Sequence, residues 1–191
     1  MNIRDLVVKN RSYRRFYEDV TIELETLKEL VDYARLSPSA ANLQPLKYIL
    51  SHEKEKNTKI FKHLAWAGYL KDWSGPGPGE RPAAYIIILA DKLIGKSANC
   101  DHGIAAQSIL LGAVEKGLGG CIIASIQKED LRKDLNIPER YDIIWVIALG
   151  KPKEEVVLEP LPEDGSIEYW RDESGVHHVP KRSLQDIILD I

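Results

Sequence analysis

The chain has 191 residues, of which 44% are hydrophobic and 29% charged, and its formal net charge at pH 7 is −3. This composition is typical of a soluble globular protein, and the length suits a single domain, residues 1–191, with a full core. The slightly acidic charge and the lack of a long basic stripe argue against nucleic acid as a partner, and no apolar run reaches the roughly 18 residues of a membrane helix.

Cysteine usage and the start of the chain indicate a cytoplasmic protein. Cys100 and Cys121 are the only cysteines, and neither belongs to a CxxC or Cys/His metal pattern. Residues 1–9 mix polar and apolar types, unlike a secretory signal. We therefore expect a reducing compartment, no metal and no membrane.

Two helices are predicted first. Asn2 can cap a short helix over 3–9, and Thr21 a longer one. The longer helix carries its apolar residues on one face: Leu24, Leu27, Leu30, Val31 and Ala34. Ser37-Pro38 ends it, because proline disfavours the helical conformation in the preceding residue.

A turn opened by Ser39, a strand over 46–51 and a helix-compatible segment over 54–65 follow. Residues 66–82 then break the pattern with aromatic side chains and a Gly-Pro-Gly-Pro-Gly run. Its glycine spacing is not a dinucleotide fingerprint, because the prolines oppose the strand and helix that this motif requires. Two readings stay open: a hinged cover over a site, or an exposed connector whose tryptophans pack on the body.

The second half interleaves apolar helices and strands. Buried strands are predicted over 84–90, 121–124 and 141–149, and a polar helix over 127–135. The longest helix, over 97–116, is apolar on most sides, and its small residues allow close helix contact. This interleaving indicates an α/β or α+β protein, followed from residue 150 by an irregular charged tail that must wrap the body or another subunit.

Basic clusters near both ends could clamp one anion. Arg11, Ser12 and Arg14 stand near the start, and Lys181 and Arg182 near the end. Arginine can bond two phosphate oxygens at once, so a phosphate group would suit a site where the ends meet. The alternative reading of the first cluster is a solvated helix end.

Two further segments have a structural and a functional reading. Residues 37–45 combine small side chains with amides, which would suit either helix capping at Ser39 or hydrogen bonding to a polar planar ring. Residues 117–120 would suit either a helix C-cap and tight turn or a close approach of backbone to a ligand.

Together these segments resemble the nitroreductase family of flavoproteins. The matching motifs, in order, are RSYRRF at 11–16, SPSAANLQP at 37–45, DHGIAAQ at 101–107, GLGG at 117–120 and KRSL at 181–184. The resemblance implies an α+β, three-layer fold with a mostly antiparallel central sheet flanked by helices. It also implies FMN as cofactor and a homodimer with both flavins at the subunit interface and a C-terminal tail wrapping the partner.

The resemblance also assigns cofactor-binding residues. The FMN phosphate would be held by Arg11, Ser12, Arg14, Lys181 and Arg182. The ribityl chain and ring would be lined by Pro38, Ser39 and Asn42, and Gly119 and Gly120 would bring backbone near N5. Many relatives carry two arginines before the serine, whereas Asn10 stands at the first of these positions.

The activity implied is an FMN-dependent oxidoreductase that passes hydride from NADH or NADPH through flavin N5 to a small nitroaromatic- or quinone-like acceptor. No side chain need act as acid or base, because the cofactor carries the chemistry, so no catalytic residue is assigned. The alternatives are other flavin chemistry on the same scaffold, such as a dehalogenase, an enoate reductase or a flavin-consuming enzyme, and a non-enzymatic flavin-binding protein.

The remaining polar candidates have plain structural explanations. His177 and His178 are expected at the surface of the tail. His102 is expected to pack in its helix with one ring nitrogen hydrogen-bonded, and Cys121 to lie in the core.

Overall fold

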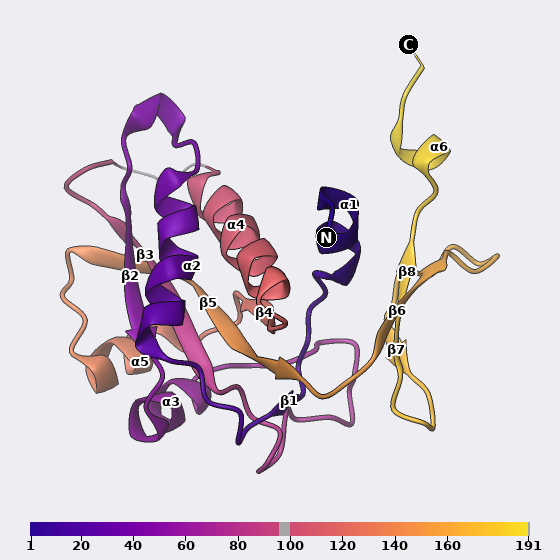
Figure 1. The fold of residues 1–191 in the computed structure, drawn as a ribbon, viewed down its shortest axis with the longest axis horizontal. Coiled ribbons are helices and arrows are strands. Elements are labelled where there is room, and N and C mark those ends of the chain that lie inside the picture. Colours follow the sequence, from indigo (N-terminus) through magenta and orange to yellow (C-terminus); the bar gives the residue numbers. More distant parts are fainter. Residues whose placement is uncertain (96–99, 191) are drawn as a thin grey trace.

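The computed structural model describes residues 1–95 and 100–190. Its centre is a five-stranded sheet of order β1-β5-β3-β2, with β4 also paired to β5 (Figure 1). Its strand pairs are antiparallel. The strands are β1 (Phe16–Tyr17), β2 (Leu46–Ser51), β3 (Ala84–Asp91), β4 (Gly119–Ile123) and β5 (Tyr141–Pro152).

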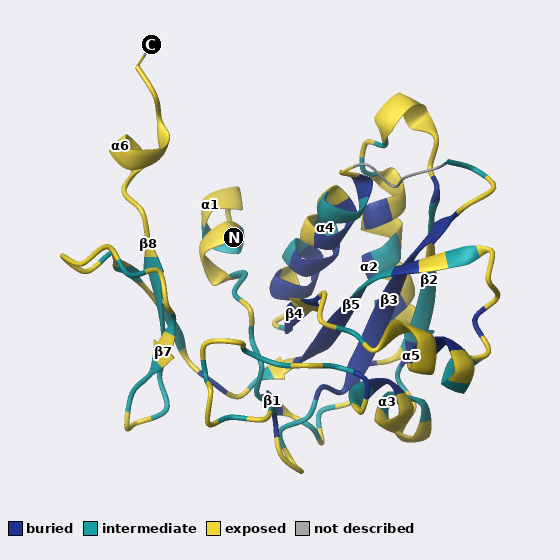
Figure 2. Cartoon of the chain, turned by 180° about the vertical axis from the view of Figure 1, so that it is seen from behind, coloured by how far each residue is buried: buried dark blue, intermediate teal, exposed yellow. Residues whose placement is uncertain are grey.

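Helices cover both faces of the sheet and make three layers. On one face lie α2 (Leu24–Leu36) and α4 (Asp101–Glu115), and on the other α3 (Lys54–Phe61) and α5 (Lys128–Leu135). The strand β3 is buried along its whole length, because alternate side chains enter the two apolar clusters (Figure 2). The predicted α+β three-layer fold is therefore confirmed. Within the described ranges, none of the helices combines the length and the apolar character needed to cross a membrane.

The end of the chain leaves this body as an arm. We call residues 153–190 the C-terminal arm. It forms a second sheet of order β6-β8-β7 (Val156–Pro160, His177–Lys181 and Trp170–Arg171) and ends in the short helix α6 (Leu184–Ile187). Both views place α1 (Ile3–Lys9) between the arm and the body (Figures 1 and 2). The prediction of an irregular tail was wrong, because its strands have only two to five residues and show no clear alternation of polar and apolar types.

Most predicted helix bounds are confirmed within a few residues. Asn2 caps α1 through reciprocal bonds with Asp5. The cap of α2 is Glu23, without a side-chain bond, so the prediction of Thr21 as cap was wrong. The helix predicted over 54–65 ends at Phe61, the one predicted over 97–116 is described from Asp101, and residues 97–99 lie outside the described ranges.

Gly112 lets α4 and α2 approach closely, as the small residues of α4 predict. A Cβ on Gly112 would lie 2.5 Å from the ring of Tyr33, whereas a Cβ on Gly103 of the same helix would meet nothing within 4 Å. We expect Gly112→Ala to lower the free energy of unfolding by about 1–3 kcal/mol through overpacking. Gly103→Ala should raise it by roughly 0.5–1 kcal/mol, because it removes backbone freedom from the unfolded chain. Urea unfolding of both variants measures the difference, and equal effects would contradict the packing of Gly112.

Candidate functional site

The loop that follows α1 is held against β4 by backbone pairing. Ser12 forms a parallel bridge with Gly120, and the Tyr13 N–H donates to the Gly120 carbonyl oxygen at 3.0 Å. A Cβ on Gly120 would lie 2.6 Å from the carbonyl oxygen of Ala148, so only glycine fits here. The predicted arginine loop and glycine turn therefore lie side by side.

A cavity of about 300 Å³ opens between this loop, α4 and the arm. It brings together five of the predicted residues, which come from both ends of the chain: Arg11, Ser12, Arg14, Gly120 and Lys181. The two basic segments thus meet in the folded chain, as an anion clamp requires.

The basic side chains of this cavity lack anionic partners. The ion pairs among the described residues use other cations and leave Arg11, Arg14 and Lys181 without a carboxylate. Arg11 Nη2 donates to the Val7 carbonyl oxygen at 2.8 Å, but its Nε is buried with no partner in the described part of the chain. Burial lowers the pKa of Arg11, yet a guanidinium stays charged at neutral pH. Unpaired cations in a cavity favour an anionic ligand with several acceptor oxygens.

The predicted ring-binding segment lies elsewhere on the chain. Pro38 and Ser39 line a separate cavity of about 200 Å³ together with Tyr48 and Asp101. The Ser39 hydroxyl donates to Asp101 Oδ2 at 2.6 Å, and the Ala40 N–H to Oδ1 at 3.0 Å, so one buried carboxylate fixes this turn. Burial and the nearby Asp101 charge raise the pKa of Tyr48 to about 12.

This turn carries unusual backbone. Ala41, Asn42 and Gln44 have φ values of 50°, 54° and 52°, a left-handed conformation that non-glycine residues seldom adopt. Such conformations persist where the surroundings impose them, and they gather at functional sites. Asp101 supplies that constraint here, a role that the sequence did not reveal.

Some predicted residues join neither cavity. Asn42 and Arg182 are exposed and line neither of the two. Gly119 is buried, and a Cβ there would lie 2.5 Å from the Tyr13 ring, which supports its structural reading. A third, smaller cavity adjoins the first, since Arg14 and Ile122 line both, and it is walled by Trp66 and by the end of β4 and the residues after it.

Comparisons with known proteins identify the family of the chain. The model of the Nitroreductase family matches residues 7–151. The chain belongs to the nitroreductase family. It is 29% identical to an Archaeoglobus fulgidus protein named "Putative NADH dehydrogenase/NAD(P)H nitroreductase", over 78% of this chain and 85% of that one. The family and this relative support an oxidoreductase activity.

Solved structures of nitroreductases share the fold. An FMN-dependent nitroreductase from Clostridium difficile R20291 is 28% identical, with a TM-score of 0.64 over 80% of this chain and 89% of that one. A nitroreductase family protein from Streptococcus pneumoniae TIGR4 is 21% identical, with a TM-score of 0.67 over 87% and 99% of the two chains.

Asn10 is the residue at which the chain departs from the motif expected of the family. It lines the cavity beside Arg11, and its Nδ2 donates to Gln107 Oε1 at 3.2 Å. The side chain therefore ties the loop to α4, and the positive charge of the cavity comes from the cations that remain.

The tail histidines differ from the sequence prediction. His177 is buried at 1% exposure, and its Nε2 lies 3.3 Å from Arg14 Nη1. His178 is partly buried and bonded to Glu159. The prediction of surface histidines was wrong, because the arm folds back on the arginine loop. Cys121 matches its prediction and is buried in a core cluster. His102 packs edge-on against Trp145 as predicted, but its Nδ1 is buried with no hydrogen-bond partner among the described residues.

Acid should destabilise the protein through His177. Burial, together with the charges of Arg14, Arg171 and His178, lowers the pKa of His177 to about 4, from about 6.5 in an unfolded chain. The unfolded chain therefore binds a proton at His177 more tightly than the folded protein does. As pH falls from about 6.5 to about 4, the contribution of His177 to the free energy of unfolding is lost. Between pH 7 and pH 5 the wild type should lose about 2 kcal/mol that a His177→Gln variant does not lose.

Urea unfolding of both proteins at the two pH values measures this difference. His178 has a raised pKa through its bond to Glu159, so its contribution has the opposite sign, but it is present in both proteins and cancels. Equal pH dependence in the two proteins would contradict the burial of a neutral His177.

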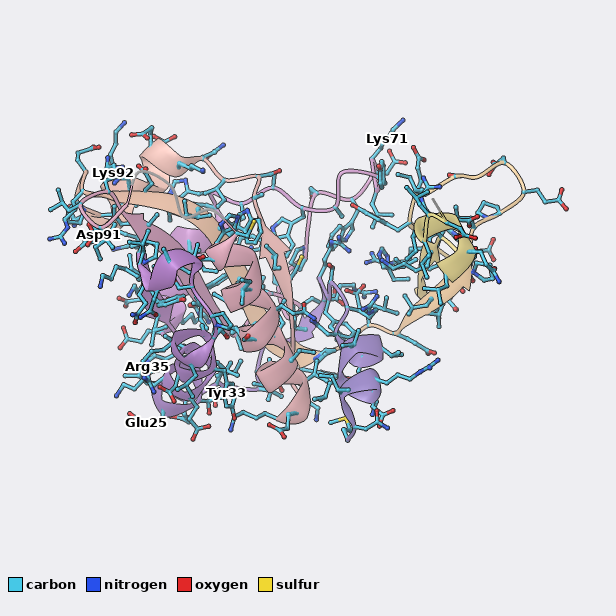
Figure 3. All side chains as sticks on the ribbon, turned by 90° about the horizontal axis from the view of Figure 1, so that it is seen from above. Glu25, Tyr33, Arg35, Lys71, Asp91 and Lys92 are labelled. Atoms are coloured by element: carbon cyan, nitrogen blue, oxygen red, sulfur yellow. The ribbon has the colours of Figure 1, made fainter. Side chains whose placement is uncertain are left out.

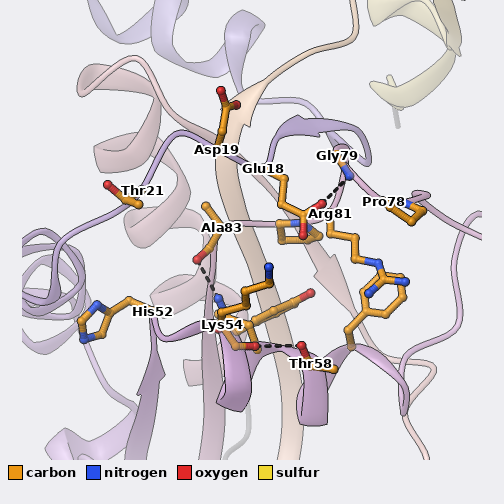
Figure 4. A pocket seen from close by; sticks show the side chains of 14 residues that line it. Glu18, Asp19, Thr21, His52, Lys54, Thr58, Pro78, Gly79, Arg81 and Ala83 are labelled. Atoms are coloured by element: carbon orange, nitrogen blue, oxygen red, sulfur yellow. Dashed lines mark hydrogen bonds between the residues drawn. The ribbon is translucent and has the colours of Figure 1, made fainter.

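Another cavity, of about 530 Å³, is lined by none of the residues that line this site (Figure 4). It is walled by the segment after β1, by α3 and by the chain before β3, and its charges are mixed. Arg81 stacks on the Phe61 ring at 4.5 Å, and Glu18 accepts from the Gly79 N–H on the same wall. It contains none of the residues that match the nitroreductase motifs, so we do not assign the cofactor to it.

Proposed function

We propose that this nitroreductase-family chain is an FMN-dependent oxidoreductase that passes hydride from NADH or NADPH to a small nitroaromatic- or quinone-like acceptor. The observation that carries the proposal is the cavity lined by Arg11, Arg14 and Lys181, none of which pairs with a carboxylate of the described residues. The name of the Clostridium difficile relative, which describes an FMN-dependent nitroreductase, supports the same cofactor.

The cavity fits the phosphate end of FMN. The buried, unpartnered Nε of Arg11 and the donors of Arg14 and Lys181 would meet its oxygens, with the exposed Ser12 hydroxyl at the same wall. Arg182, next in sequence to Lys181, would add charge at the rim. When bound, FMN supplies hydride acceptance and release at its ring.

The protein's own part is to bind and orient. The cations hold the phosphate, and the backbone at the end of β4 walls the adjoining cavity. Fixed positive charge and N–H dipoles favour developing negative charge on a bound ring without reorganisation. We therefore assign no catalytic acid or base.

We further propose a homodimer in which the partner completes each site. Within one subunit, Ser39 and its turn line a different cavity from Arg11. A single chain therefore does not bring the predicted ring-binding residues and the predicted phosphate-binding residues into one cavity. The arm and α1 also expose apolar side chains: Ile3, Val7, Val8, Leu184, Ile187, Ile188 and Leu189. An apolar surface of this kind favours association, and the interface would bring the Pro38, Ser39 and Asn42 turn of one subunit to the phosphate cavity of the other.

Residues 66–82 would cover the acceptor side of the site. Trp66 packs on Phe61, as the connector reading predicts, but Tyr69 packs edge-on against Tyr169 and Trp73 lies under Arg171, both in the arm. Figure 3 shows Lys71, within this segment, on the side of the molecule that carries the arm and away from Tyr33. The segment thus lies beside the proposed site, where it would limit acceptor size.

The absorption spectrum of the purified protein tests the proposed function. We expect bound flavin bands, and loss of the long-wavelength band on anaerobic addition of NADH or NADPH, followed by recovery with a quinone or nitroaromatic. Flavin that neither nicotinamide reduces would indicate a flavin-binding protein without this activity. Reduction without transfer to these acceptors would indicate other flavin chemistry, and a preparation that takes up no FMN would contradict the proposal. A cytoplasmic location would suit the nicotinamide supply.

A further inference from the structure

Glu154 is a buried acid at the point where the body becomes the arm. Its side chain is 0% exposed, and it lies two residues after the end of β5. A buried carboxylate is costly unless ion pairs and hydrogen bonds compensate for its lost hydration. Its partners therefore identify what it holds together.

Glu154 joins two parts of the proposed phosphate site. Its Oε1 accepts from the backbone N–H groups of Arg14 and Arg15, the latter at 3.1 Å. Its Oε2 accepts from Arg171 Nη2 of the arm at 2.8 Å. One carboxylate thus fixes the backbone of the arginine loop relative to the arm.

The fixed backbone determines where the Arg14 side chain lies. Arg14 Nη1 lies 3.3 Å from His177 Nε2, and its guanidinium stacks on the Tyr169 ring at 4.8 Å. Both partners belong to the arm and line the cavity with Arg14. Glu154 itself is not a lining residue, so its effect on a ligand would pass through Arg14.

From this geometry we infer that Glu154 is a positioning residue for the phosphate site, which sets the Arg14 guanidinium at the cavity by holding the loop and the arm on one carboxylate. The inference rests on the proposed function. Charge alone would make a nearby carboxylate oppose phosphate binding. A positional role and a purely electrostatic role therefore predict opposite results.

The test is the ratio of FMN to riboflavin affinity in full-length protein freed of flavin. Glu154→Asp keeps the charge but withdraws the carboxylate by one methylene, whereas Glu154→Gln loses the charge but keeps an acceptor oxygen in place. Positioning predicts that E154D lowers the ratio about tenfold and that E154Q stays within about threefold of wild type. E154Q should still lower the melting temperature, because its amide faces Arg171.

Glu80→Asp is the matched control. Glu80 pairs with Arg15 and Lys153 on the other side of the same loop and is partly buried. E80D should lower stability and leave the ratio unchanged. An unchanged ratio in E154D, or a loss in E154Q or E80D equal to that expected of E154D, would overturn the inference.

The wild type separates this inference from the proposed function. If wild-type protein binds FMN and riboflavin equally, the phosphate site itself is wrong. If wild type prefers FMN and E154D does too, only the role of Glu154 is wrong.

Discussion

Replacing Arg11 by alanine is expected to weaken FMN binding by about 1.5–3 kcal/mol, roughly ten- to hundredfold, with riboflavin affinity nearly unchanged. The reason is that Arg11 lines the cavity and, among residues 1–95 and 100–190, has neither a carboxylate partner nor a hydrogen-bond partner for its buried Nε. A hydrogen bond to a charged phosphate stabilises a complex about twice as much as a neutral hydrogen bond. Riboflavin has no phosphate, so it makes no such bond to Arg11 and its affinity should not change. Titration of the flavin-free protein by flavin fluorescence quenching measures both affinities.

Lys9→Ala is the control for charge in the same segment. Lys9 lies in the last turn of α1, close to Arg11 in sequence, but it does not line the cavity. We expect its removal to change FMN affinity by less than about threefold, as for a screened surface charge. If K9A and R11A lower the affinity for FMN equally, the effect is long-range electrostatic attraction, and Arg11 makes no contact with the phosphate.

Placing aspartates on α6 is expected to dissociate the proposed homodimer and to release its flavin. Leu184 and Ile187 are 68% and 61% exposed in the subunit, so the substitutions should not disturb the subunit core. Burial of such a side chain against a partner contributes about 1.5–3 kcal/mol, so losing both and burying charge should raise the dimer dissociation constant at least roughly a hundredfold. Sedimentation velocity and the flavin absorbance of the sedimenting species measure both effects.

Leu93→Asp is the matched control for this variant. Leu93 is 76% exposed and follows Lys92, which Figure 3 places at the end of the body away from the arm. L93D should remain dimeric and keep its flavin. A double variant at Leu184 and Ile187 that remains dimeric would show that α6 does not contact a partner, and a monomer that retains flavin would contradict a site shared between subunits.

The two central strands of the sheet could be predicted because β3 along its whole length, and β5 over much of its length, are buried. The apolar runs 84–90 and 141–149 correspond to β3 and to most of β5, which is the pattern expected for central strands. The arm could not be predicted in this way. β7 has only two residues, and β6 pairs with β8 in parallel across a long connection, so neither a turn signal nor an alternation marks them.

In the candidate site, too, residues that are close in sequence could be predicted and distant partners could not. Arg11, Ser12 and Arg14 are close in sequence, so the motif alone placed them together. The partners that orient Arg14 are distant, Glu154 and His177 being separated from it by 140 and 163 positions. In the sequence, each of them is one polar residue among many in a charged tail. No local pattern marks either as a neighbour of Arg14, because the contact exists only in the folded chain.

The most direct test of the account is the affinity of the unmodified protein for FMN compared with riboflavin, measured on the same flavin-free preparation at one salt concentration. The cations around the cavity predict that FMN binds at least about a hundredfold more tightly, because each of several donors gains a charged acceptor. The preference should decrease as salt is added, since part of it is electrostatic. Equal affinities for the two flavins would contradict a phosphate site formed by Arg11, Arg14 and Lys181.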